Sequence, residues 1–321
     1  MDRRKLFKKY TPFLCIGTFG FVFFASYFFL TSPPRAFPQN FIAEIPEGMS
    51  LNDIARYLKQ ENLIKNSFMF KLIAKLGGKE TSIISGSYYF KKSENLFSIS
   101  GRLSRGESGL FPTRITIFEG YANYDIAREL SKILPHIDPV KFLKKAEAKE
   151  GRLFPDTYFF LPNADEDDVI NTMYENFEKK TEEIKEDIKK SKHDFEDVLI
   201  MASILEKEAH ETEVRKKIAG ILWKRLDAGM ALQVDATLTY VVRRNTFEIT
   251  KEDLSFDSPY NTYKYPGLPI GPIANPGLDA ILSAIYYKDT PYWFYLSDRS
   301  GNTYFSETFP EHVEKKRKYL N

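Results

Sequence analysis

The sequence predicts an α+β protein that begins with a transmembrane helix and continues into two small β-α-α-β modules and a C-terminal α+β domain. Three observations lead to this prediction. Residues 11–30 form an uncharged apolar stretch. An internal repeat with strand and helix patterns follows this stretch. The C-terminal half alternates helical apolar patterns with loops rich in proline and tyrosine.

The composition is that of a folded protein with more than one compact unit. The chain has 321 residues, of which 43% are hydrophobic and 28% are charged, and these values are typical of globular domains. The formal net charge is only +2, so the strong positive field of many nucleic-acid-binding proteins is absent. We therefore expect no nucleic acid among its partners.

The first 40 residues predict a tail, a membrane span and a spacer. Residues 1–10 carry five basic side chains against one acidic side chain, and residues 11–30 carry no charge. A helix of about 20 apolar residues crosses the ~30 Å hydrocarbon core of a bilayer, and a basic flank stays on the cytoplasmic side. We expect a single-pass anchor in the lipid bilayer over 11–30, a cytoplasmic tail over 1–10 and an exported remainder. Residues 31–40, with three prolines, form the linker.

A cleaved signal peptide is the alternative to an anchor. The apolar stretch is long for a signal core, and no small-x-small cleavage site precedes the polar segment TSPPRAFPQ. The sequence therefore favours an uncleaved anchor. The single cysteine, Cys15, lies inside the predicted span. The exported part consequently has no disulfide and must be held by its hydrophobic core.

An internal repeat follows the linker. The segments IPEGMSLNDIARYL at 45–58 and IFEGYANYDIAREL at 117–130 are identical at eight of fourteen positions without a gap. In each copy a short strand precedes Glu-Gly, two helices follow, and an aromatic strand closes the unit. We predict one β-α-α-β module over 41–110 and a second over 111–164, before a domain over 165–321.

This strand-helix-helix-strand order resembles the lysin-motif (LysM) fold, which holds chains of N-acetyl sugars. The resemblance implies that either module could bind glycan. A role as a spacer or as an oligomerisation unit stays open, because a fold alone does not define a site.

The helix predicted around 198–210 carries the main candidate for chemistry. VLIMASIL, residues 198–205, is apolar apart from one serine, which indicates a helix through a core. Glu206 is the first ionisable group after this run, whereas Glu208 points to the opposite side at 100° per residue. Partial burial would raise the pKa of the Glu206 carboxyl, as a general acid near neutral pH requires. The alternative is a solvated helix end where Glu206 pairs with His210 or Lys207.

Two later segments suggest a surface for sugars. YNTYKYPGLPIGPIANPG, residues 260–277, contains four prolines and three tyrosines, and LQVDATLTYV precedes it at 232–241. Aromatic faces beside asparagine, threonine and backbone amides suit the C–H faces and hydroxyls of sugars. A loop that only covers a core is the alternative.

Together these segments resemble the endolytic murein transglycosylase (YceG-like) family. The resemblance is carried by EGRLFPDTY, ASILEKEA, LQ-x-D-x-T, YNTY-x3-GLP-x-GPIANPG and TPYWFYLSD, and it runs from about Phe41 to the C-terminus. It implies a bacterial lytic transglycosylase with its catalytic domain over 165–321, anchored in the cytoplasmic membrane and active outside it. Such an enzyme cuts nascent peptidoglycan strands between N-acetylmuramic acid and N-acetylglucosamine and leaves 1,6-anhydromuramyl ends. A role in ending strand growth, near cell-wall synthases, is implied by the family only.

The resemblance also assigns residues. On the matching positions Glu206 would be the catalytic acid/base, which protonates the glycosidic oxygen and then accepts the proton of the muramyl C6 hydroxyl as that oxygen closes on C1. Because one carboxyl serves both steps, no second carboxylate is needed, unlike in hydrolases. A structural role of Asp235 as a turn or cap residue stays open. The residues implied to hold the substrate are Gln233, Asp235, Thr237, Asn261 and Tyr263.

The sequence departs from the family's pattern at three positions. Ala236 and Ile270 stand where proline is usual, which loosens two loops. Thr303 stands where a histidine is expected, which weakens the case for a histidine as a second base. The other motifs are intact.

Two other functions stay open. A membrane-tethered glycan-binding or scaffold protein would use the repeats and the aromatic loop without cutting, and a two-carboxylate muramidase would pair Glu206 with Asp235 or Asp257. A zinc enzyme is not expected, because the four histidines show no His-x3-His spacing and no cysteine is exported. Acid/base chemistry on an acetal needs no cofactor, so we expect none.

Overall fold

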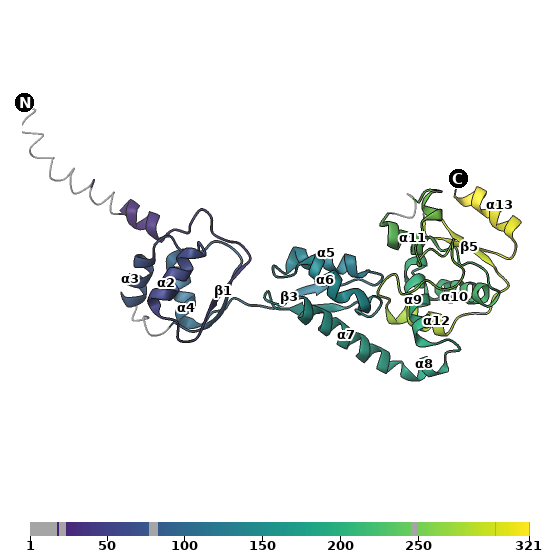
Figure 1. The fold of residues 1–321 in the computed structure, drawn as a ribbon, viewed down its shortest axis with the longest axis horizontal. Helices are drawn as coiled ribbons and strands as arrows, with labels where there is room; N and C mark the ends of the chain where they lie inside the picture. Colours follow the sequence, from purple (N-terminus) through teal and green to yellow (C-terminus); the bar gives the residue numbers. More distant parts are fainter. Residues whose placement is uncertain (1–17, 19–23, 77–82, 245–248, 299, 321) are drawn as a thin grey trace, which may run out of the picture. The chain divides into compact units, whose positions relative to one another are not determined.

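The computed structural model describes residues 18, 24–76, 83–244, 249–298 and 300–320 (Figure 1). These residues form two compact units. The N-terminal unit comprises the described residues up to Pro112 together with Leu161–Asn163, and the C-terminal unit comprises Thr113–Phe160 and the described residues from Ala164 onward. Helices and small antiparallel two-stranded sheets make up both units, so the predicted α+β class is confirmed.

The predicted membrane span falls largely on residues that the structure does not describe. Residues 11–17 and 19–23 lie outside the described ranges, as does the predicted tail over 1–10. Among the residues that are described, no helix is both long and apolar enough to cross a bilayer. The anchor therefore stays a prediction.

The N-terminal unit has the predicted order of strand, helix, helix and strand. β1 (Phe41–Ile45) pairs antiparallel with β2 (Gly86–Phe90), so that the first residue of one strand lies opposite the last residue of the other. Between them in sequence lie α2 (Leu51–Gln60) and α3 (Ser67–Leu76). The Ser50 hydroxyl caps α2 by accepting the Asp53 amide. Apolar side chains of all four elements share one core.

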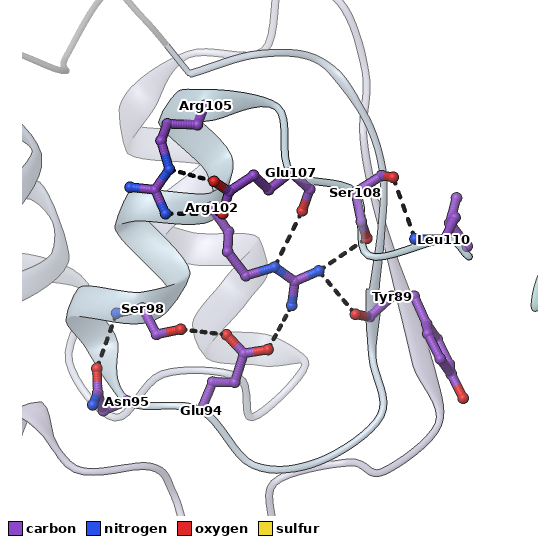
Figure 2. Close-up of polar contacts among 9 residues, drawn as sticks. All are labelled: Tyr89, Glu94, Asn95, Ser98, Arg102, Arg105, Glu107, Ser108 and Leu110. Carbon is purple, nitrogen blue, oxygen red and sulfur yellow. Dashed lines mark hydrogen bonds and ion pairs between the residues drawn. The ribbon is translucent and has the colours of Figure 1, made fainter.

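A further helix, α4 (Leu96–Arg105), completes this unit and was not predicted from the sequence. Figure 2 shows its Arg102, whose guanidinium pairs with Glu94 and donates to the carbonyl oxygens of three residues, Tyr89, Glu107 and Ser108. The Arg102 side chain is only 12% exposed, so these charge-assisted bonds are shielded from water. They fix the segment after α4 against β2.

The C-terminal unit begins with the second β-α-α-β segment. β3 (Thr113–Thr116) pairs antiparallel with β4 (Thr157–Phe160), and α5 (Asn123–Ile133) packs on α6 (Pro139–Ala146) between them in sequence (Figure 1). A short 3₁₀ helix, η1 (Glu147–Lys149), follows α6. The glycines of the repeated Glu-Gly turns, Gly48 and Gly120, have φ of +79° and +78°. Both turns thus use the left-handed conformation that glycine adopts without strain.

A pair of helices leads from this segment to the rest of the unit. The charged segment 165–192 has apolar residues at helical spacing, which is typical of one amphipathic helix. The structure divides it into α7 (Glu166–Glu183) and α8 (Lys185–Lys190). Ile184 interrupts them with non-helical backbone while its side chain is buried in the core. The apolar face of α7 joins the core of the second β-α-α-β segment through Val169, Ile170 and Met173.

The remaining helices build the largest core. α9 (Phe195–Glu208) is buried from Val198 to Glu206, as its apolar run predicts, and it packs against α10 (Thr212–Asp227) and α12 (Leu278–Ile285). α11 (Asp235–Val242) contacts α9, and η3 (Asp253–Ser255) contacts α11. A hairpin of β5 (Phe294–Ser297) and β6 (Thr303–Ser306) is covered by α13 (Phe309–Tyr319).

Asn275, in the proline-rich loop, joins the second β-α-α-β segment to these helices. It is fully buried, its backbone amide donates to the Tyr121 carbonyl at 2.9 Å, and its carbonyl accepts the Gly120 amide at 3.0 Å. Its side-chain oxygen accepts the Leu153 amide at 2.8 Å. These bonds hold distant parts of the sequence in one rigid arrangement, which brings α5 to the wall of the site described next.

Candidate active site

The C-terminal unit contains a cavity of about 710 Å³. Its lining comes from elements that are far apart in sequence, namely α5, α9, α10, α11, β5 and α13, together with the loops beside them. A volume of this size suits part of an extended ligand. The lining combines aromatic side chains with many polar and charged groups.

Glu208, the last residue of α9, is the glutamate that faces this cavity. It is partly exposed, yet protein atoms surround it so closely that loss of hydration is the largest influence on its pKa. Burial raises the pKa of Glu208 to about 7, a hydrogen bond from the Tyr295 hydroxyl offsets this in part, and the charge of Asp235 raises it again. Near neutral pH both forms of the carboxyl are populated, as an acid that must later act as a base requires.

Glu206 lies on another face of α9, away from the cavity. Its side chain is 3% exposed, and it pairs with the Arg215 guanidinium, which is 5% exposed. The Gly277 amide donates to its other oxygen at 3.0 Å. Burial raises the pKa of Glu206, whereas the Gly277 amide and Arg215 lower it. Both oxygens are engaged, and α10 and the start of α12 enclose the carboxyl.

The Glu206–Arg215 pair holds the end of α9 in place. Arg215 also donates to the Ala209 carbonyl at 2.8 Å and to Asp279 at 2.6 Å. Three helix ends are thereby joined, and Glu208 projects from one of them. The geometry favours Glu208 over Glu206 as a proton donor to a bound molecule, which differs from the assignment that the sequence predicts.

Three of the five predicted substrate-binding residues line the cavity: Gln233, Asp235 and Tyr263. Gln233 has an exposed side chain and a φ of +53°, a conformation that residues other than glycine seldom adopt and that is enriched at functional sites. The Tyr263 hydroxyl donates to Asp235. Burial raises the pKa of Tyr263, and the bond to Asp235 raises it further, so the hydroxyl stays a donor.

The other two, Thr237 and Asn261, are fully buried and do not line the cavity. The Thr237 hydroxyl lies 3.0 Å from that of Thr262, and the Asn261 amide donates to the carbonyls of Leu254 and Phe256 at 3.0 and 2.8 Å. These bonds fix the first turn of α11, which carries Asp235, and the loop that carries Tyr263.

The positions that depart from the family's pattern lie in different surroundings. Ala236 lines the cavity, whereas Ile270 is 70% exposed. The Thr303 hydroxyl lies 3.1 Å from that of Ser297 across the β5–β6 hairpin, and the histidine that lines the cavity is His312. Within the described ranges, no group of three or more His, Cys, Asp or Glu side chains is arranged to hold a metal ion.

Glu150 supports an aromatic wall that the sequence did not indicate. Burial raises the pKa of Glu150 to about 7, while the Asn123 amide and the Tyr240 hydroxyl lower it in part. Tyr240 lines the cavity and donates to Glu150 at 3.1 Å. The Tyr240 ring lies 5.0 Å from that of Tyr260 and 6.5 Å from that of Tyr124. The motif EGRLFPDTY contains Glu150, but only the fold brings it behind Tyr240.

Comparison with known proteins agrees with this architecture. The model of the YceG-like family matches residues 43–318. The endolytic murein transglycosylase of Bacillus subtilis (strain 168) is 32% identical over 304 residues, which cover 86% of this chain and 84% of that protein. The protein of the same name from Streptococcus pneumoniae serotype 2 (strain D39) is 27% identical over 320 residues; the match covers 86% of this chain and 58% of that longer relative.

A crystal structure of a yceG-like protein from Listeria monocytogenes is also similar. It has a TM-score of 0.60 and 30% sequence identity, and the match covers 86% of this chain and 99% of that one. The chain belongs to the YceG-like family.

Proposed function

We propose that this protein is an endolytic lytic transglycosylase that cleaves the glycan strands of peptidoglycan, with Glu208 as its acid/base. The relatives' printed name, endolytic murein transglycosylase, supports the reaction class. The observation that carries the assignment of the residue is the position of Glu208 in the cavity with a pKa of about 7. Glu206, enclosed by Arg215 and Gly277, supports the helix end instead.

The proposed reaction needs one carboxyl. Protonated Glu208 donates its proton to the oxygen of the bond between N-acetylmuramic acid and N-acetylglucosamine, and the bond from the muramyl C1 to that oxygen breaks. The muramyl C6 oxygen then forms a bond to C1 and gives its proton to the Glu208 carboxylate. The products are a strand with a 1,6-anhydromuramyl end and a strand with a free hydroxyl, no water is consumed, and Glu208 is protonated again.

Matched substitutions on one helix test this proposal. Glu208→Gln and Glu206→Gln each exchange one carboxyl for an amide, and purified strands are digested with each variant before mass spectrometry of the ends. We expect wild-type protein to yield anhydro ends, and Glu208→Gln to lower the rate by at least about 100-fold because the proton donor is lost. Glu206→Gln should keep most of the rate if it stays folded. Loss of activity in folded Glu206→Gln, with activity kept in Glu208→Gln, would return the role to Glu206.

The same products separate the rival functions. Asp235 lines the cavity and lies close enough to Glu208 to raise the pKa of that glutamate. This position favours Asp235 as the second carboxylate of a hydrolase. Asp257, in contrast, has a side chain that is 75% exposed and bound by Lys264. Reducing ends would indicate that hydrolase. Equal release of glycan products by wild-type protein and by both variants would indicate a glycan-binding or scaffold protein without catalysis.

We further propose that residues 11–30 anchor the protein in the bacterial cytoplasmic membrane, with the N-terminus inside and the cavity outside. The basic residues before this stretch and its lack of charge support this orientation. Protease added to intact spheroplasts should remove the C-terminal unit and leave the N-terminal tail protected. Protection of the C-terminal unit would contradict the orientation.

The finer roles that the family implies belong to the same proposal. Cleavage of nascent strands near cell-wall synthases would end their growth, so cells without this protein should contain longer strands on chromatography of amidase-treated peptidoglycan. The LysM-like segments would hold glycan, and exposed Phe159, which is 66% accessible on β4, suits a sugar face. Phe159→Ser should weaken co-sedimentation with peptidoglycan, and unchanged co-sedimentation would speak against that surface.

A further inference from the structure

One wall of the cavity carries positive charge that the protein itself does not neutralise. Arg225 is 6% exposed and lines the cavity, and its guanidinium donates to the carbonyl oxygens of Trp293 and Leu232 at 2.9 and 2.7 Å. Lys316 lines the same cavity from α13. In the part of the chain that the structure describes, neither cation forms an ion pair with a carboxylate. An unpaired buried cation costs free energy.

His312 lies beside these two cations. The Phe294 ring is flanked by the Arg225 guanidinium carbon at 5.2 Å and by the His312 ring at 5.4 Å. Burial lowers the pKa of His312, and the nearby charges of Lys316 and Arg225 lower it further. Among the described atoms, the buried His312 Nδ1 has no hydrogen-bond partner. Within the described residues, the wall thus combines a buried cation, Arg225, and an exposed cation, Lys316, neither of them ion-paired, with an imidazole nitrogen that has no hydrogen-bond partner.

The acidic groups of the cavity are engaged elsewhere. Asp298 accepts bonds from the Ser300 and Asn302 amides and from the Tyr304 hydroxyl, and Asp235 accepts the Tyr263 hydroxyl. Glu208, with a pKa of about 7, is only partly charged at neutral pH. Asp235 and Asp298 keep their charge, but the described lining holds four cations, Lys207, Arg225, Arg244 and Lys316, against three acidic groups. The excess of positive charge favours a bound anion at the wall with Arg225.

We propose that Arg225, His312 and Lys316 form a subsite for a carboxylate carried by the muramyl residues of the substrate. This inference rests on the proposed function and names the substrate more closely. Of the two sugars in the strand, N-acetylglucosamine is neutral, whereas N-acetylmuramic acid carries a lactyl ether. That ether ends either in its own carboxylate or in a stem peptide with carboxylates. The preferred substrate is then a strand whose carboxylates are free, and carboxyl-amidated strands bind less tightly.

Binding measurements with chemically matched strands test the subsite. The full-length Glu208→Gln protein is used, so that cleavage does not consume the ligand. Its dissociation constants are measured for stem-bearing strands, for stem-free strands with free lactyl carboxylates, and for both after amidation of their carboxyls with methylamine. We expect amidation to weaken binding about tenfold, the size of one good charged contact. An effect limited to stem-bearing strands identifies the stem carboxylates, and an effect on both types identifies the lactyl group.

Two substitutions in one turn of α13 provide the matched control. Lys316→Glu reverses a charge in the cavity wall, whereas Arg317→Glu reverses a charge in the same turn at a residue that does not line the cavity. We expect Lys316→Glu to weaken binding of untreated strands about tenfold or more and Arg317→Glu to change it less than about twofold. The NMR titration of His312 should also move to higher pH when untreated strands bind, but not when amidated strands bind.

The outcomes separate this inference from the proposed function. Equal affinity for untreated and amidated strands overturns the subsite. An equal loss of affinity for untreated strands in Lys316→Glu and Arg317→Glu overturns it as well. Cleavage by Glu208→Gln would contradict the proposed catalyst. The subsite would then be tested by the rate of cleavage at low strand concentration, which should be about tenfold lower for amidated than for untreated strands.

Discussion

The raised pKa of Glu208 predicts that the substitution that removes activity also stabilises the protein. The carboxyl has a pKa of about 7 in the folded protein against an ordinary value of 4.5. Below pH 4.5 it is protonated in the folded and unfolded states alike. As the pH rises from 4.5 to 7 the unfolded chain releases the proton first, so the folded protein loses stability over this interval. Above pH 7 the loss is complete.

The size of the effect follows from the pKa difference. A difference of about 2.5 corresponds to about 3 kcal/mol of unfolding free energy, as an upper value because cavity water reaches the carboxyl. Glu208→Gln is neutral at every pH and keeps a partner for the Tyr295 hydroxyl. We expect it to exceed wild-type stability by up to about 3 kcal/mol at pH 8 and by close to zero at pH 4.

Tryptophan fluorescence provides the assay. The chain has two tryptophans, Trp223 and Trp293, and both lie in the C-terminal unit, so the signal reports unfolding of that unit. Urea unfolding of wild-type protein, of Glu208→Gln and of Glu175→Gln is followed at pH 4, 6 and 8. Glu175 is an exposed residue of α7 and serves as the control. This prediction would be refuted if the excess of the Glu208→Gln unfolding free energy over that of the wild type stayed constant or shrank as the pH rises.

Three further predictions concern other contacts. Tyr295→Phe removes the hydroxyl that lowers the pKa of Glu208. The cleavage rate, which falls as Glu208 loses its proton, should therefore begin to fall at a higher pH than in the wild type. A fall at the same pH or at a lower pH contradicts this prediction. Arg102→Met removes bonds to Glu94 and to three backbone carbonyls and should destabilise the N-terminal unit by about 2–4 kcal/mol. Hydrogen exchange of β2 and α4 should quicken while the tryptophan signal is unchanged, and unaltered exchange would be the contrary result. Gly220→Ala places a Cβ against the Lys288 carbonyl oxygen. It should lower the free energy of unfolding, measured in urea, by about 2 kcal/mol, although alanine is preferred over glycine in helices by ~1 kcal/mol. Equal or greater stability would show that this contact can relax.

Local patterns in the sequence were sufficient to predict the two repeated segments and the buried helix α9. The repeated segments at 45–58 and 117–130 each form a glycine turn and a helix between paired strands, because apolar period and turn chemistry act over a few residues. The apolar run before Glu206 predicts a buried helix, and α9 is one. The motifs predict the family, which the match over residues 43–318 confirms. The sequence analysis misses helix α4 although its buried Leu96, Ile99 and Leu103 recur at helical spacing. It also misses the break at Ile184, because a single irregular residue leaves a weak pattern.

Only the tertiary structure decided which glutamate faces the cavity. The helical wheel separates Glu206 from Glu208, but it does not show which side the rest of the protein covers. Arg215 and the Gly277 amide cover Glu206, while Tyr295 and Asp235 lie near Glu208. Except for Arg215, these partners are 27 to 87 residues away in sequence from the glutamate that each contacts. Periodicity reports the burial of a face, whereas the choice between an ion pair and a cavity depends on packing between distant segments.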